Sequence, residues 1–81
     1  MAIMKGEKAM LDYEVRRKIT VLSENRKTLW TKELNLISWN GATPKYDIRD
    51  WSPDHQKLSK GITLTEAEMS RIKDAVICGM I

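Results

Sequence analysis

The sequence predicts an α+β domain in which a four-stranded antiparallel sheet is followed by one C-terminal helix. Three observations predict it. Apolar and polar side chains alternate with a period of two in several stretches between residues 13 and 64, as they do in half-buried strands. Asn40-Gly41 is a strong signal for a β-hairpin. Thr65-Glu66-Ala67-Glu68 has the pattern of a helix-capping box. The 81 residues suffice for one domain.

The first strand is expected to begin at Tyr13. Residues 1–12 contain Gly6 and show no sustained period, so we expect a tail or a short irregular element there and assign the domain to residues 13–81. From residue 13 the apolar side chains are predicted to share one side of the strand: Tyr13, Val15, Ile19 and Val21. The polar run 24–27 suits a hairpin connection.

A second strand is predicted over residues 28–40. It places Leu34 and Leu36 on one face and Trp39 on the other. Because a strand usually has about five or six residues, this length predicts a bend or bulge within it. After the Asn40-Gly41 turn, the third strand is predicted from Lys45 to Trp51. Its two faces carry Tyr46 and Ile48 on one side, and Lys45, Asp47, Arg49 and Trp51 on the other.

Proline ends the third strand, because Pro53 lacks a backbone donor and restricts the residue before it. A fourth strand is predicted over residues 58–64, with Gly61 at a bulge. The helix then begins at Thr65 as N-cap, and Gly79 is expected to end it. Its apolar stripe has helical spacing: Met69, Ile72, Ala75 and Val76.

Residue counts exclude several kinds of site. Cys78 is the only cysteine and His55 the only histidine, so an intramolecular disulfide and a zinc cluster are excluded. No nucleophile–base arrangement or phosphate-binding glycine loop is present, and we expect no enzyme, cofactor, metal or small-molecule substrate. The N-terminal apolar run is too short for an export signal, and no segment could span a membrane. We therefore expect a cytoplasmic protein. A chain this short also has a thin stability margin, which favours a dimer.

One face of the sheet is the candidate binding surface. The formal net charge is +3, and the excess of basic residues lies upstream of the helix. If Tyr46 and Ile48 meet the helix, then Lys45, Arg49 and Trp51 face solvent, with Trp39 beside them across the hairpin. Exposed tryptophans and cations could stack on bases and follow phosphates. The same tryptophans could instead pack under the N-terminal tail or be buried in a dimer interface, and the pattern alone ranks a stacking surface and a buried interface about equally.

A family resemblance favours the first alternative. Residues 15–78 resemble the transcriptional coactivator family called positive cofactor four, and in particular its small bacterial YdbC-like members. The resemblance rests on Asn40-Gly41, on Tyr46-Asp47-Ile48-Arg49-Asp50-Trp51, and on Lys60-Gly61-Ile62-Thr63-Leu64 before the helix. It departs from the eukaryotic coactivators where Trp51 directly follows the acidic residue and where Ser59 replaces a basic residue.

The resemblance implies a homodimer whose curved sheets bind single-stranded DNA largely regardless of sequence. By position, Arg49 matches the family's strand arginine, Trp51 its stacking tryptophan and Lys60 the lysine before the fourth-strand glycine. Trp39 falls at the aromatic before the hairpin glycine, and alternation adds Lys45. The expected role lies in transcription regulation, replication or repair. Two alternatives stay open: binding of single-stranded RNA, and a protein–protein interaction dimer without nucleic acid.

Overall fold

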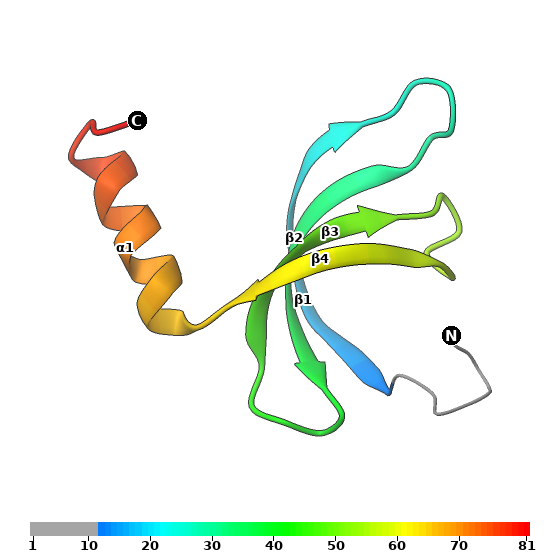
Figure 1. Cartoon of the computed structure of the whole chain (residues 1–81), viewed down its shortest axis with the longest axis horizontal. Coiled ribbons are helices and arrows are strands. Elements are labelled where there is room, and N and C mark those ends of the chain that lie inside the picture. The colour runs from blue at the N-terminus through cyan, green and yellow to red at the C-terminus, as the bar shows by residue number, and fades with distance from the viewer. Residues whose placement is uncertain (1–11) are drawn as a thin grey trace.

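The computed structural model describes residues 12–81 and shows the predicted order of four strands and one helix (Figure 1). The expectation of a tail at residues 1–12 falls outside the described residues except for Asp12. The elements are β1 (Tyr13–Glu24), β2 (Thr31–Trp39), β3 (Lys45–Trp51), β4 (Leu58–Leu64) and α1 (Glu66–Ile77). The strands pair antiparallel in the order β1-β2-β3-β4, so each strand lies beside its neighbours in the chain.

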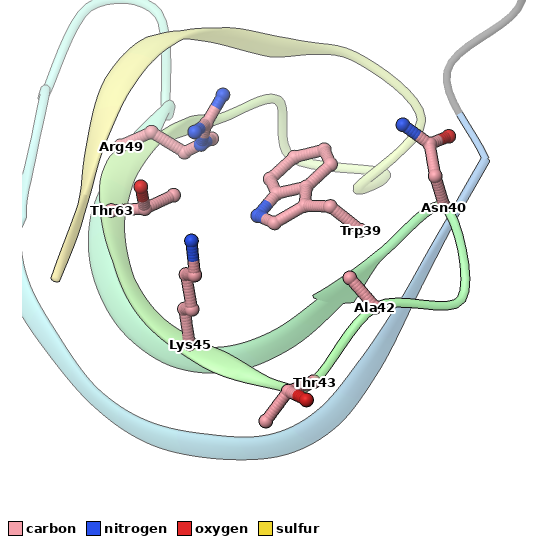
Figure 2. Close-up of a pocket in the computed structure, with 7 residues that line it drawn as sticks. All are labelled: Trp39, Asn40, Ala42, Thr43, Lys45, Arg49 and Thr63. Atoms are coloured by element: carbon pink, nitrogen blue, oxygen red, sulfur yellow. The ribbon is translucent and has the colours of Figure 1, made fainter. Parts of the chain in front are cut away.

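The sheet curls strongly, so that it has a concave and a convex face (Figure 1). Directly paired residues of antiparallel strands point to the same face. Arg49 is paired with Glu33, Asp47 with Asn35 and Lys45 with Ile37. This register confirms that the odd-numbered residues of β2 and β3 share a face, which is the concave one in Figure 2. Leu34 and Leu36 pair with Ile48 and Tyr46 on the convex face.

β1 does not keep the predicted alternation. Its pairing with β2 shifts register three times, between Val15 and Arg17, Lys18 and Thr20, and Val21 and Ser23. Each shift skips one residue of β1, so Ile19 has no partner in β2. The expected apolar row therefore breaks after Val15. The bend or bulge expected within the second strand is absent from its pairing with β3, which has no register shift. The bulges lie in β1 instead. β2 also begins at Thr31 rather than at residue 28. Bulges bend a strand and increase its twist, which suits the curl of this sheet.

The predicted turn and bulge are present in the other strands. Asn40 and Gly41 have φ angles of 51° and 73°, and Ala42 N donates to Trp39 O at 2.8 Å, as in a tight β-turn with positive φ at both central residues. A register shift lies between Arg49 and Trp51, where β4 has one residue more than β3. Gly61 pairs with Arg49 at the edge of this shift. The strand therefore bulges beside Gly61, as predicted.

The capping box of α1 is confirmed. Glu68 N donates to Thr65 Oγ1 at 3.1 Å, and Thr65 N donates to Glu68 Oε1 at 2.8 Å. Gly79, with φ 74°, follows the last turn, and Met80 N donates back to Ala75 O at 2.8 Å. The helix contains no buried residue and stands to one side of the sheet (Figure 1). No helix in residues 12–81 is long and apolar enough to cross a membrane.

The buried core is small and lies on the concave side. Ile37 and Trp51 are the fully buried apolar residues among those described, because the curl of the sheet closes around them. The apolar residues of the convex face are only half-buried or exposed, and Ile62 is 57% exposed. The helix does not cover this face. The predicted exposure of the concave face assumed that the helix packs on Tyr46 and Ile48, and the single chain does not provide that cover.

Candidate functional site

A hollow of about 390 Å³ opens on the concave face. Side chains from β2, β3, β4 and the β2–β3 turn line it: Trp39, Asn40, Ala42, Thr43, Lys45, Arg49 and Thr63. Figure 2 shows Trp39, Lys45, Arg49 and Thr63 pointing into the space that the curved strands enclose. The hollow thus brings together Trp39, Lys45 and Arg49, which are three of the five residues that the sequence singled out.

Trp39 forms one wall of the hollow. Its ring lies 5.4 Å from that of Tyr13, at an angle of 46°. The guanidinium carbon of Arg49 lies over the Trp39 ring, 4.6 Å from its centroid, which is a cation–π contact. Trp39 is half-buried, and its Nε1 has no hydrogen-bond partner within residues 12–81. The ring is therefore fixed in place while part of it borders the open space.

The guanidinium of Arg49 is held by hydrogen bonds and is largely buried rather than presented freely to solvent. Its Nε and Nη2 donate to Asp47 at 2.6 and 2.7 Å, and its Nη1 donates to the carbonyl of Ser59 at 3.1 Å. The Arg49 side chain is 11% exposed and that of Asp47 is 0% exposed. A bidentate carboxylate neutralises the guanidinium, so Arg49 shapes the hollow more than it offers a free positive charge.

Lys45 supplies the accessible charge of the hollow. It is exposed, and it makes no ion pair in the part of the chain that the structure describes. Lys60 is exposed as well, but it lies on the bulged stretch of β4 and does not line the hollow. The two lysines are thus the cations from the predicted set that an anionic ligand could reach directly.

Trp51 shares the concave face but is 0% exposed. The expected exposure of Lys45, Arg49 and Trp51 together is therefore correct for Lys45 alone. The Trp51 ring lies 5.8 Å from that of Tyr13 and is stacked on the ring of His55, with centroids 4.2 Å apart and planes at 7°. The β3–β4 loop covers this tryptophan by placing His55 against it.

A polar network holds His55. Its Nε2 lies 2.9 Å from Glu33 Oε1, and Glu33 also accepts hydrogen bonds from Thr31 at 2.6 Å and Asn35 at 3.1 Å. Burial acts to raise the pKa of Glu33, but the hydrogen bonds from Thr31, Asn35 and His55, with the charge of His55, outweigh it and hold the pKa below its ordinary value. Glu33 is therefore charged at neutral pH.

Sequence reasoning missed three residues of the site. Asp47 could have been found, because it lies two residues before Arg49 and alternation puts both on one face. Tyr13 was assigned to the sheet but not to the site, and the register that places it opposite Trp39 follows from the fold. His55 lies in the β3–β4 loop, and no sequence pattern indicated that its ring would cover Trp51. Among the described residues, no cluster of potential metal ligands occurs.

Comparison with known proteins identifies the family of this chain. The family model described as transcriptional coactivator p15 (PC4) matches residues 26–75, which include β2, β3, β4 and most of α1. An uncharacterized protein of Treponema pallidum (strain Nichols) is 52% identical over 62 residues, covering 76% of this chain and 72% of that protein. The coactivator family is known for single-stranded DNA binding and is not an enzyme family. Because its model matches more than half of the chain, this protein belongs to the transcriptional coactivator p15 (PC4) family.

Proposed function

We propose that this protein binds single-stranded DNA on the concave face of its sheet, with little dependence on base sequence. The observation that carries the proposal is the hollow in which Trp39, Lys45 and Arg49 meet, in a chain of this family. An aromatic wall accepts any base, because every base has a stacking face, and a nearby cation follows the phosphate backbone. No catalytic step is part of the proposal.

Each predicted residue has a distinct role in the proposal. Trp39 stacks on a base, and Lys45 contacts a phosphate from within the hollow. Lys60 contacts the backbone from the bulge of β4. Arg49 holds the Trp39 ring in position through its cation–π contact, and Trp51 provides a second stacking surface beneath His55. These residues differ in how exposed they are, so their substitutions should differ in their effects on DNA binding and on stability.

The binding unit in this proposal is a homodimer. The convex face carries apolar side chains that the single chain leaves partly exposed, and the apolar stripe of α1 is likewise uncovered, with Ile72 42% and Val76 54% exposed. A large exposed apolar surface on a small protein indicates an interaction site. A second copy that covers this surface would leave both concave faces free for a strand. We place the homodimer in the cytoplasm, where it would serve transcription regulation, replication or repair.

The direct test is a titration with fluorescently labelled oligo(dT) at two salt concentrations. Binding should weaken as salt increases, because each phosphate contact on a single strand adds about −0.7 to the slope of log K against log salt. Lys45→Ala should reduce the magnitude of that slope by about this amount for each occupied protomer. Arg71→Ala is the matched control, since it removes an exposed cation of α1 outside the apolar stripe and should leave the slope unchanged.

Trp39→Ala should weaken binding by about 1–3 kcal/mol, the range for loss of one stacked base. Equal affinity of the wild type and the Trp39→Ala and Lys45→Ala variants would eliminate the concave face as the binding surface. A matched oligo(rU) competitor identifies the ligand class, because stacking alone does not read the 2′-hydroxyl. If oligo(rU) displaces oligo(dT) preferentially, the natural ligand of the same surface would be RNA. Absence of binding to either oligomer would support the protein–protein alternative.

A further inference from the structure

His55 lies on Trp51 in the geometry that a base would adopt. The two rings are nearly parallel, at 7°, with centroids 4.2 Å apart. Stacking of this kind holds bases on tryptophan in single-strand binding proteins. The imidazole thus occupies the face of Trp51 that a base would need, and Trp51 is 0% exposed in this state.

The remaining surroundings of Trp51 come from the sheet itself. Tyr13 of β1 meets the Trp51 ring at 60°, which is a tilted contact. His55 differs from Tyr13 because it belongs to the connection between β3 and β4, and its side chain is 25% exposed. Among these neighbours, the His55 ring can leave Trp51 without unpairing a strand.

The β3–β4 loop fixes the backbone of His55, whose N–H donates to Ser52 O at 2.8 Å, so the ring would leave Trp51 by rotation of the side chain alone. Ser52 N donates to Lys57 O at 2.9 Å, and Lys57 N donates to Ser52 Oγ at 2.9 Å, which closes the base of the loop. His55 lies within this closed loop with φ 62°, a left-handed conformation that is uncommon for residues other than glycine. Backbone conformations of this kind are found at sites that change on ligand binding. The side chain is held at Glu33 by a contact of 2.9 Å.

The closed state also leaves polar atoms unsatisfied. Trp51 Nε1 and Asn35 Oδ1 are buried and have no hydrogen-bond partner within residues 12–81. A buried polar atom without a partner destabilises the state that contains it.

We propose that His55 is a base mimic that covers the stacking face of Trp51 until an unpaired nucleobase displaces it. The inference rests on the proposed single-strand binding and adds a positioning residue to that site. A base within a duplex is already stacked on both sides and cannot take the place of the imidazole. An unpaired base is therefore the ligand that can displace the imidazole from Trp51.

The first test uses the wild-type protein and needs no substitution. Nuclear Overhauser contacts between the His55 ring and the Trp51 indole are expected in the free protein and should disappear when oligo(dT) is added. Indole signals are assigned with Trp30→Phe and Trp39→Phe variants. Contacts that persist in an oligo(dT) complex would overturn the inference while leaving the proposed function intact. If oligo(dT) does not bind at all, the proposed function itself fails.

The second test removes the ring but keeps the loop conformation. His55→Asn is chosen because asparagine tolerates a positive φ. Since an aromatic pair no longer has to be broken, oligo(dT) should bind about two- to twelve-fold more tightly. Gln56→Ala, at the exposed neighbouring position, is the control and should bind like the wild type. Affinity of His55→Asn equal to or weaker than that of the control would contradict the role of His55 as a removable cover.

Discussion

Asp47 binds the guanidinium of Arg49 through both carboxylate oxygens, at 2.6 Å to Nε and 2.7 Å to Nη2. The pair lies on one strand, two residues apart, and Asp47 is 0% exposed. Arg49 also contacts the Trp39 ring, so the ion pair links the buried floor of the sheet to the wall of the hollow. Arg49, which the sequence predicts as a nucleic-acid-binding residue, therefore acts first by pairing with Asp47 and holding the Trp39 ring.

Arg49→Ala should destabilise the protein strongly. The substitution leaves the buried carboxylate of Asp47 without its partner, and loss of one member of a buried ion pair costs about 3–5 kcal/mol. Urea denaturation measures the effect. The double variant Asp47→Leu with Arg49→Met should recover most of the lost stability, because replacing a buried ion pair by apolar side chains is often close to neutral. A single Arg49→Ala variant as stable as the wild type would show that the pair contributes nothing.

Gly61→Ala should destabilise β4 at its pairing with Arg49. A Cβ at this position would overlap the carbonyl oxygen of Ile48 and Cβ of Arg49, and would lie 3.1 Å from Cα of Arg49. Since backbone atoms cannot move aside as a flexible side chain can, we expect a loss of about 1–3 kcal/mol, as for overpacked sites. Thermal unfolding measures it. Lys60→Ala, at the adjacent exposed position, should change stability little, and similar losses in both variants would argue against the steric cause.

The order of elements could be predicted because local signals agree with one another. Alternation in β3, the Asn40-Gly41 turn and the capping box each depend on neighbouring residues, and all three are confirmed. The register of β1 could not be predicted, because its three shifts arise from the pairing with β2 and not from its own pattern. Alternation from Tyr13 onwards gave a regular strand that the curled sheet does not contain.

The faces of the site were predicted correctly, but its accessibility was not. Alternation places Trp39, Lys45, Arg49 and Trp51 on one side, as the register shows. Whether a residue on that side is exposed depends on curvature and on the loops that fold over it. Trp51 is buried against Tyr13 and His55, and the His55 contact joins a strand to a loop whose sequence only indicates a turn. Tertiary contacts of this kind leave no periodic signal.

Acid should destabilise the protein partly through Glu33. Its folded-state pKa is lowered from an ordinary value of 4.5, so the unfolded state takes up protons first as pH falls. The stabilising contribution of Glu33 is present above pH 4.5 and is lost as pH falls through the lower folded-state pKa. Asp54, whose pKa is lowered by hydrogen bonds from Ser52 and Gln56, acts with the same sign.

Glu33→Gln isolates the contribution of Glu33 to this acid sensitivity. Urea denaturation is measured for the wild type and the variant at neutral pH and at a series of values below pH 4.5. The difference in stability between the two proteins should shrink as the solution becomes more acidic, since protonated Glu33 has lost its charge in both states. Asp54 is common to both proteins and cancels. A difference that stays constant across this range would mean that the charge of Glu33 does not stabilise the fold.

Ile72→Asp should weaken self-association if a second copy of the chain packs against the apolar stripe of α1. Ile72 is 42% exposed in the single chain, so a charge there costs little in a monomer but is buried without a partner in a dimer. Sedimentation equilibrium across a range of protein concentrations should show a wild-type dimer and a largely monomeric variant. Ser70→Asp adds the same charge at an exposed position on the other side of the helix and should leave the dimer intact. A wild type that sediments as a monomer throughout would remove the dimer from the proposed function, while equal dimerisation of wild type and Ile72→Asp would exclude α1 from the interface.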